Sequence, residues 1–323
     1  MKVASLFAGV GGICMGFENN GFEVVWSNDA DAKASETYRE NFSHSHVISK
    51  IEEVNTADIP DVDVVTSGFP CTSFSIAGYR KGFEDENSGH LFLETLRIIK
   101  AKRPKIIFLE NVKNLVAHDD GKTFEIIKDA LEQNGYHIKH KVLNSCEYGN
   151  VPQNRERIYI VGFLDKESCE RFSFPQEVKR TNKVSDVTNP SEKKDEKYYY
   201  RKQRKRGKTI KDCIYYPELV KEMKNKHTVY QIRRVYIREN KKNLCPTLTA
   251  NMGTGGHNVP LVIDDHGFRK LTPRECFLMQ GFPHTYKFPS KMADSHLYKQ
   301  AGNSVTVTVI DSIVKQIKKA IKK

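Results

Sequence analysis

Short apolar runs that alternate with amphipathic stretches are the feature of the first half of the chain that most constrains its fold. The apolar runs lie at residues 3–7, 22–26, 62–66, 106–109 and 158–161, and the stretches 91–102 and 123–134 carry apolar residues at helical spacing. Strands that alternate with helices build a sheet covered on both faces, because each crossover lays a helix against it. The sequence therefore predicts an α/β fold with a doubly wound, mostly parallel sheet.

This alternation of apolar runs and amphipathic stretches stops between residues 176 and 262. The stretch 179–208 is rich in lysine and arginine and is interrupted by Tyr198, Tyr199 and Tyr200, which is typical of a surface region. The stretch 229–262 is more apolar and glycine-rich, which indicates a small β-rich module. Helical spacing returns from Leu271, and we expect a last amphipathic helix from about Asn303. We therefore predict a large domain from 1–175 with 265–323, and a smaller β-rich recognition domain from 176–264.

The composition narrows the choice of partners. A chain of 323 residues that is 38% hydrophobic buries a sizeable core, and its formal net charge of +12 favours a polyanionic partner. Nucleic acid is the first interpretation, although a basic membrane-surface protein has the same charge balance. No apolar stretch approaches the roughly 18 residues of a membrane span, so we expect a cytoplasmic protein that does not cross a membrane. Seven scattered cysteines, without paired or histidine-rich spacing, argue against disulfides and against a metal site.

A glycine-rich loop follows the first expected strand and opens a helix. In a doubly wound sheet this is the position at which backbone N–H groups and a nearby acid, here Asp29 after the second strand, receive a nucleotide-like cofactor. A tight turn made only for packing, or the cofactor site of a nicotinamide dehydrogenase, gives the same local pattern. The loop residues are Phe7, Ala8, Gly9, Val10, Gly11 and Gly12.

Reactive residue types stand at the ends of the next strands. Cys71 follows Pro70 directly after the third strand, and Glu110 ends the fourth strand. Arg155 and Arg157 precede the strand at 158–161. Most free cysteines are small buried hydrophobes, but a Pro-Cys step at a strand end followed by Thr72 and Ser73 favours a functional thiol.

With these motifs in order, the chain resembles the cytosine-5 DNA methyltransferase family, in its small bacterial restriction-modification form. The Pro-Cys step, the Glu-Asn pair at Glu110 and the Gln-x-Arg-x-Arg pattern at 153–157 match the family's motifs, as do the stretches 269–276, 280–283 and 300–305. Thr272 and Glu275 also form a helix capping box with Pro273 inside it. The resemblance covers nearly the whole chain except about 176–228.

The resemblance implies the cofactor and the chemistry. S-adenosyl-L-methionine is the expected cofactor, and the fold is expected to be that of methyltransferases which use it. Cys71 is the expected nucleophile that attacks C6 of a flipped-out cytosine, with Glu110 at N3, Arg157 at O2 and Arg155 supporting the thiolate or the carboxylate. Besides the glycine loop, the expected cofactor contacts are Asp29, Ala30, Lys50, Ile51, Pro70, Leu91, Asn303 and Ser304. Family members often carry an aromatic residue where this chain has Ala30, and an acid near the adenine where it has Lys50 beside Ile51.

The same resemblance implies how DNA is held. Gln231 is expected to fill the gap left by the extruded base, Arg234 to read a guanine and Thr247 to press on a phosphate. Further expected DNA contacts are Arg80 and Lys81, in a lid at 72–87, together with Tyr236, Gly255 and Gly256.

Double-stranded DNA is thus the expected substrate of a monomeric enzyme, with a cognate restriction endonuclease as a functional partner. Three alternatives stay open at this point: a transfer-RNA methyltransferase with the same catalytic motifs, a catalytically silent DNA-binding protein, and a nicotinamide dehydrogenase. A base-reading module favours duplex DNA over RNA, because A-form RNA hides its major groove from side chains.

Overall fold

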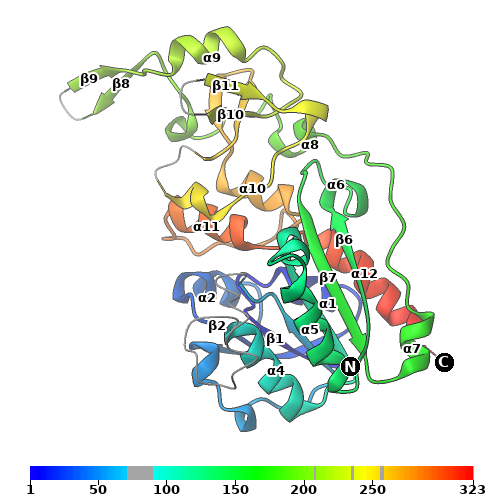
Figure 1. Ribbon diagram of the computed structural model, residues 1–323. Coiled ribbons are helices and arrows are strands. Elements are labelled where there is room, and N and C mark those ends of the chain that lie inside the picture. Colours follow the sequence, from blue (N-terminus) through cyan, green and yellow to red (C-terminus); the bar gives the residue numbers. More distant parts are fainter. Residues whose placement is uncertain (71–89, 207–208, 234–235, 255–257, 323) are drawn as a thin grey trace.

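The computed structural model describes residues 1–70, 90–206, 209–233, 236–254 and 258–322. Its largest element is a seven-stranded sheet with the strand order β3-β2-β1-β4-β5-β7-β6 (Figure 1). The strands from β3 to β5 are parallel, whereas β7 runs antiparallel to both of its neighbours. The strands are β1 Lys2–Leu6, β2 Glu23–Asp29, β3 Ser45–Ile48, β4 Val64–Ser67, β5 Ile106–Val112, β6 His137–Asn144 and β7 Glu156–Phe163.

The predicted doubly wound, mostly parallel sheet is confirmed. All the strands expected from apolar runs are present, and the structure adds β3 and β6 at the two edges. These edge strands were missed because they are largely exposed or half-buried and therefore lack a continuous apolar run.

Helices cover both faces of this sheet. Successive residues of a strand point to opposite faces, so Val3 of β1 packs with α1 (Gly12–Glu18) and α12 (Val307–Ala320). Ala4, the next residue, packs on the other face with α4 (His90–Lys102) and α5 (Lys122–Gln133). The shorter helices of this part are α2 Ala32–Arg39, α6 Ser145–Tyr148, α7 Lys166–Arg171, η1 Ile51–Glu53, η2 Thr56–Asp58 and η3 Lys113–Ala117.

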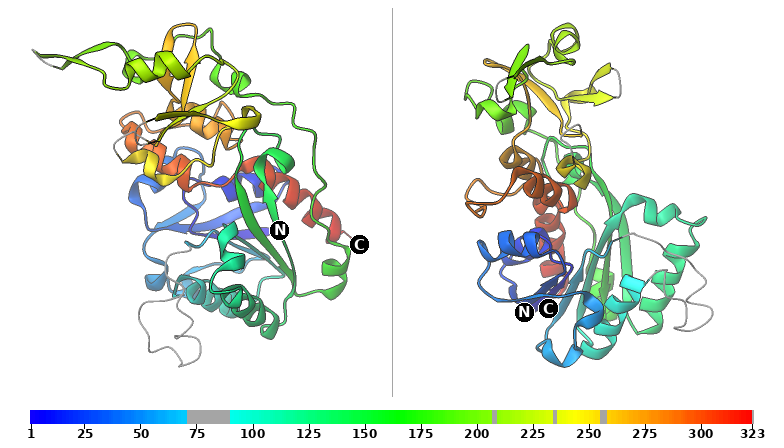
Figure 2. Two further views of the ribbon diagram at one scale, coloured as in Figure 1. Left: turned by 45° about the horizontal axis from the view of Figure 1, so that its top comes forward. Right: turned by 90° about the vertical axis from the view of Figure 1, so that its left-hand side faces the viewer.

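A smaller, mainly β unit lies at the other end of the molecule, at the top of Figure 1. It holds an antiparallel sheet in the order β11-β10-β12-β13, and β8 pairs only with β9 in a separate hairpin. Its strands are β8 Gln203–Arg206, β9 Thr209–Asp212, β10 Tyr230–Arg233, β11 Tyr236–Glu239, β12 Leu261–Asp264 and β13 Gly267–Lys270. Its helices are α8 Val184–Thr188, η4 Glu196–Tyr198, α9 Tyr216–Glu222, η5 Lys241–Asn243 and η6 Ala250–Gly253, and α10 Pro273–Met279 and α11 Asp294–Asn303 lie between this unit and the large sheet (Figures 1 and 2).

Two local expectations are corrected by the structure. The stretch 179–208 is not only surface, because Tyr198 and Tyr199 are buried and the Tyr199 hydroxyl donates to Asp264 at 3.0 Å. The last helix begins at Val307, since Asn303 ends α11. The backbone leaves the helix there because the carbonyls of Gly302 and Ser304 accept hydrogen bonds from Arg155 instead of from a following helical turn.

A buried ion network anchors the small sheet to α10. The Arg269 guanidinium is fully buried and donates to Asp264 at 2.6 Å and to both oxygens of Glu275 at 2.8 Å. Glu275 also accepts from the backbone N–H of Thr272, and the Thr272 hydroxyl accepts from that of Glu275. The predicted capping box is therefore confirmed, and it shares its carboxylate with the β13 arginine.

Three further observations concern the described residues only. The cysteines at 14, 146, 169, 213, 245 and 276 are free thiols. In the part of the chain that the structure describes, no cluster of three histidine, cysteine, aspartate or glutamate side chains is arranged to hold a metal ion. Within the same ranges, every helix is too short or too polar to cross a lipid bilayer.

Candidate active site

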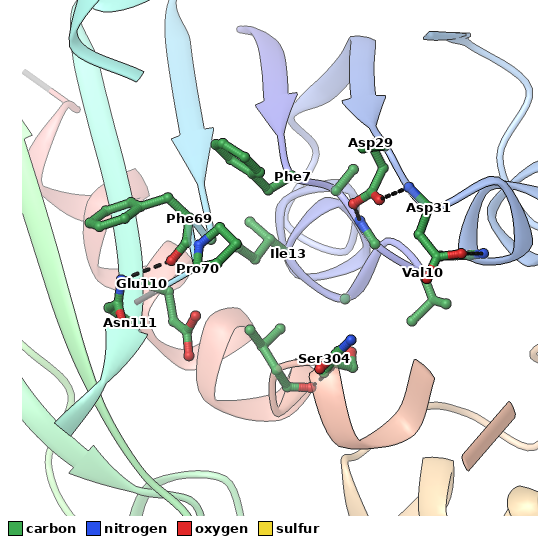
Figure 3. A pocket seen from close by; sticks show the side chains of 18 of the residues that line it. Phe7, Val10, Ile13, Asp29, Asp31, Phe69, Pro70, Glu110, Asn111 and Ser304 are labelled. Atoms are coloured by element: carbon green, nitrogen blue, oxygen red, sulfur yellow. Dashed lines mark hydrogen bonds between the residues drawn. The ribbon is translucent and has the colours of Figure 1, made fainter. Parts of the chain in front are cut away.

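The carboxyl ends of β1, β2, β4 and β5 meet at one edge of the large sheet and form one wall of a cavity of about 600 Å³. Phe7, Asp29, Pro70 and Glu110 line it from these strands. Figure 3 shows them facing the turn that carries Ser304, which closes the opposite side. The crevice at the carboxyl edge of a doubly wound sheet is where ligands of such folds bind.

The reversed direction of β7 brings the two arginines to this same edge. In an antiparallel pair the beginning of one strand lies beside the end of the other, and Arg157 pairs with Val112, the last residue of β5. Arg155 precedes β7, and both arginines line the cavity. A parallel strand in this place would have put them at the far edge of the sheet.

The glycine loop is shaped by Asp29. One carboxylate oxygen accepts from the Gly9 N–H at 2.7 Å and the other from the Asp31 N–H at 2.8 Å, as Figure 3 shows. Gly11 has φ +81°, and a Cβ there would lie 2.2 Å from the Phe42 ring, so only glycine fits. Burial raises the pKa of Asp29 above its ordinary value, although the two backbone N–H groups lower it. The loop and the acid therefore form one preorganised unit.

Glu110 and Arg157 form an ion pair at the other end of the cavity. Arg157 Nε lies 3.1 Å from Glu110 Oε1, and both side chains are nearly buried. Burial raises the pKa of Glu110, whereas the positive charges of Arg157 and Arg155 lower it. The result is a carboxyl group with a raised pKa, next to a cation and open to the cavity, and such a group is suited to hold or share a proton with a bound base.

Asn111, the neighbour of Glu110, is bonded to the turn that follows β4. Its side-chain N–H₂ donates to the carbonyl of Phe69 at 2.8 Å, and both residues are buried (Figure 3). This bond ties the end of β5 to the turn that follows β4. Pro70, which comes next and lines the cavity, is the last residue described before Cys71.

Arg155 donates to backbone carbonyls of other segments, and the Cys71 thiolate that it was expected to support lies outside the described residues. Its guanidinium donates to the carbonyls of Leu248 at 2.7 Å, Gly302 at 3.2 Å and Ser304 at 2.5 Å. The side chain is 2% exposed, and its Nε has no hydrogen-bond partner among the described residues. Arg155 thus holds the turn at 302–304 against the segment at Leu248.

Gln153 strengthens the same connection. Its side-chain oxygen accepts from the Leu248 N–H at 3.0 Å, and its nitrogen donates to the Met279 carbonyl at 2.9 Å. Gly302 approaches Thr249 so closely that a Cβ on Gly302 would lie 2.1 Å from the Thr249 carbonyl carbon. The segment of the small unit between η5 and η6 is therefore packed directly against the wall of the cavity.

Nearly all expected cofactor residues line the cavity. Gly11 instead faces the Phe42 ring, and the expected residues that line the cavity are Phe7, Ala8, Gly9, Val10, Gly12, Asp29, Ala30, Lys50, Ile51, Pro70, Leu91, Asn303 and Ser304. Family members often carry an acid near the adenine where this chain has Lys50 and Ile51, and in this structure the next residue, Glu52, lines the cavity. Sequence reasoning missed other lining residues, most of which follow strands or motifs that it had found: Ile13, Ala34, Gly68, Phe69, Asn111, Val112, Gln300, Gly302 and Val305.

Of the expected DNA contacts, Gln231, Tyr236 and Thr247 are described. Gln231 and Tyr236 lie on the β10–β11 hairpin, and Tyr236 is 54% exposed. The Thr247 hydroxyl donates to the Asn154 carbonyl at 2.8 Å. Arg80, Lys81, Arg234, Gly255 and Gly256, and the nucleophile Cys71, lie outside the described residues.

The cavity fits S-adenosylmethionine in size and chemistry. Its volume of about 600 Å³ lies within the usual range for small-molecule sites. Asp29 presents a carboxylate at the end of β2, where ribose hydroxyls are commonly bound, and Phe7, Ile51 and Leu91 supply apolar surface. A fold of this kind, with a cofactor cavity at the carboxyl edge beside a buried acid–arginine pair, defines an α/β group-transfer enzyme of the methyltransferase class.

The comparisons with known proteins identify the family. The family model described as C-5 cytosine-specific DNA methylase matches residues 1–319. The type II methyltransferase M.Bsp6I of Bacillus sp. (strain RFL6) is 57% identical over 322 residues, covering 99% of each chain. The type II methyltransferase M.HhaI of Haemophilus parahaemolyticus is 36% identical over 330 residues, covering 98% of this chain and 94% of that protein. The chain therefore belongs to the C-5 cytosine-specific DNA methylase family and is a DNA (cytosine-5)-methyltransferase that uses S-adenosylmethionine.

Solved structures support the fold assignment. The S. pombe Dnmt2 methyltransferase matches with a TM-score of 0.72 at 19% identity, covering 100% of both chains. A mutant of Spodoptera frugiperda DNMT2 matches with a TM-score of 0.73 at 19% identity, covering 98% of this chain and 99% of that one. At this identity the similarity shows the shared fold alone.

Proposed function

We propose that the enzyme methylates C5 of a flipped-out cytosine in a short, specific duplex DNA site through a covalent adduct of Cys71 at C6. The observation that carries this proposal is the ion pair between Glu110 and Arg157 at 3.1 Å, nearly buried in the wall that Pro70 also lines. A carboxyl group and a guanidinium side by side match the N3 and O2 edge of a cytosine. None of these groups can reach a base inside a stacked duplex, so the cytosine must leave the stack.

The proposed chemistry starts with the Cys71 thiolate. It forms a C–S bond to C6, and Glu110, as the protonated acid, shares its proton with N3 while Arg157 donates to O2. The charge that develops on the ring is thus stabilised by groups already in place, and C5 becomes nucleophilic. S-adenosylmethionine supplies the methyl group that C5 takes up. Transfer of the C5 proton to a solvent base, return of the N3 proton to Glu110 and departure of the thiolate from C6 then restore the aromatic ring.

We assign the remaining site residues by their position in the cavity. Asp29 is placed to accept from ribose hydroxyls, and Phe7, Ile51 and Leu91 to contact the adenine. The glycine loop, Asn303 and Ser304 line the rest of the wall. We assign Arg155 as a positioning residue, since its guanidinium bonds three backbone carbonyls and is not paired with Glu110.

We propose that the part at 176–264 recognises the DNA site and that 1–175 with 265–323 carries the catalysis, with DNA between them. Gln231, Tyr236 and Thr247 are proposed DNA contacts, together with Arg80, Lys81, Arg234, Gly255 and Gly256. The full-length similarity to type II methyltransferases supports a role beside a cognate restriction endonuclease. With double-stranded DNA as the substrate, we propose that the enzyme acts in the cytoplasm, and we also propose that a monomer performs the reaction.

The test is transfer of labelled methyl from S-adenosylmethionine to duplex DNA, with nucleoside analysis of the product. We expect 5-methylcytosine from the native enzyme and from Cys213→Ser, which removes a thiol far along the chain from the Pro-Cys step, and none from Cys71→Ser. Duplex DNA that contains 5-fluorocytosine is expected to trap a covalent complex with the native enzyme only. Methylation of transfer RNA but not of DNA would contradict the proposal, as would an unchanged rate in Cys71→Ser.

A further inference from the structure

The outward face of the β10–β11 hairpin carries an unusual set of side chains. Strand residues alternate between faces, and Tyr230, Ile232 and Ile237 point inward and pack in the small core with Leu219 and Leu261. The register pairs Gln231 with Arg238 and Arg233 with Tyr236, so these four share the opposite face. This hairpin lies at the end of the molecule away from the large sheet (Figures 1 and 2).

One amide oxygen holds two guanidinium groups on this face. Gln231 Oε1 accepts from Arg238 at 2.7 Å and from Arg233 at 3.1 Å. Within the described ranges neither arginine forms an ion pair with a carboxylate. Glu239, the acid of the same hairpin, faces the other side, where it accepts from Tyr230 and Asn225. The positive charges of Arg233 and Arg238 are thus gathered around the neutral Gln231 amide, and no carboxylate among the described residues neutralises them.

Apart from the Tyr236 hydroxyl, which can donate and accept, the free hydrogen-bonding groups of this face are donors. The guanidiniums only donate, and the Gln231 oxygen is already taken by them, which leaves the Gln231 N–H₂ group as a further donor. In the major groove guanine presents two acceptors, O6 and N7, whereas cytosine presents a donor at N4. A two-stranded β ribbon is also narrow enough to enter that groove. The face therefore complements guanine and the phosphates beside it.

We propose that Arg238, held in place by Gln231, reads a guanine in the major groove of the recognition site, with Arg233 beside it on the DNA. This inference rests on the proposed function. It adds a specificity-determining residue, Arg238, to the base contacts at Gln231 and Arg234 that the family resemblance implies. The Arg238 guanidinium is held by the Gln231 side-chain oxygen, and its backbone is fixed in β11. It therefore loses less conformational entropy on binding DNA than an unsupported arginine side chain.

The experiment begins with the methylation site mapped by bisulfite sequencing of DNA methylated by the native enzyme. Each guanine of that site is then replaced in turn by 7-deazaguanine, which lacks the N7 acceptor, and kcat/KM is measured. We expect a loss of about 10- to 100-fold at one guanine, the size of one good base contact. Arg238→Ala is expected to lose about the same factor on unmodified DNA and to be insensitive to 7-deazaguanine at that one position.

Arg238→Lys keeps the positive charge, so it distinguishes hydrogen bonding to a base from electrostatic attraction to the phosphates. It is expected to retain most of the affinity for DNA but to accept other bases at that position, because an ammonium lacks the planar fork. The matched control is Lys226→Ala, which removes a cation of the same unit that is already paired with Asp265 at 2.7 Å. We expect the control to keep full base discrimination.

Three outcomes overturn the inference. If Arg238→Ala remains as sensitive as the native enzyme at every guanine, Arg238 does not read one. If Arg238→Ala and Lys226→Ala weaken all sequences equally, the face provides only charge. If the native enzyme methylates no duplex DNA, the proposed function fails and this inference falls with it, and methylation by the native enzyme distinguishes that case from the other two.

Discussion

Replacing Arg155 by methionine tests whether this side chain joins the wall of the cofactor cavity to the segment of the small unit between η5 and η6. The guanidinium is 2% exposed and bonds the carbonyls of Leu248, Gly302 and Ser304. Each buried carbonyl left unpaired costs about 1–3 kcal/mol. Part of this is offset because methionine removes a buried charge that was costly to desolvate. We expect the free energy of unfolding to fall by about 2–4 kcal/mol, estimated from these two opposing effects.

The functional effect follows from where the three carbonyls lie. Gly302 and Ser304 line the cavity, so a loosened turn at 302–304 lowers cofactor affinity even while the protein stays folded. We expect Arg155→Met to bind S-adenosylhomocysteine about 10-fold more weakly, the equivalent of about 1.4 kcal/mol. Arg155→Lys is expected to recover little of this, because one ammonium cannot reach carbonyls on two segments.

Urea unfolding and isothermal titration with S-adenosylhomocysteine measure both quantities. The control is Arg171→Met. The partly exposed Arg171 guanidinium donates to the Ala320 carbonyl and the Ser168 hydroxyl and forms ion pairs with exposed carboxylates, so its loss is expected to cost less than about 1 kcal/mol. The positioning role is refuted if the free energy of unfolding of Arg155→Met lies within about 0.5 kcal/mol of the native value and the variant binds S-adenosylhomocysteine normally. So small a change in stability is what substitutions at ordinary surface sites produce.

Three further predictions concern other buried or half-buried titratable groups. Arg269→Met leaves Asp264 and Glu275 buried without their cation and is expected to lower the free energy of unfolding by about 3–5 kcal/mol, which urea denaturation measures; a loss below 1 kcal/mol would contradict this. Burial, with smaller effects of Arg39 and His44, lowers the pKa of His46 from 6.5 to about 4. Below pH 6.5 the unfolded chain therefore binds a proton that the folded protein does not. The stability that His46 contributes is complete above pH 6.5 and is lost as the pH falls towards 4. Thermal melts of the native protein and of His46→Gln test this, and an equal pH dependence in the two would refute the assignment. Burial raises the pKa of Asp29, so affinity for S-adenosylhomocysteine is expected to fall as the pH drops through that raised pKa, whereas Asp29→Asn is expected to bind weakly and without this pH step in calorimetric titrations.

Much of the site was predictable because its parts follow short local signals. The glycine loop, Asp29 and Glu110 each stand directly after an apolar run, and the carboxyl ends of parallel strands must meet at one edge. The close approach of Gly11 to the Phe42 ring, and the presence of Glu52 at the cavity next to Lys50, were not predictable, since both depend on how a turn packs.

The sequence alone determined the doubly wound sheet, the order of the motifs and the family, because periodicity and motif spacing are local properties of the chain. Only the tertiary structure decided that β7 runs antiparallel and so delivers Arg155 and Arg157 to the cavity edge. It also decided that Asn303 ends one helix instead of beginning another, that Arg155 bonds three carbonyls, and that Gln231 gathers Arg233 and Arg238. These outcomes depend on contacts between residues far apart in the chain or across a strand pair, and the free energy of such contacts is absent from any local pattern.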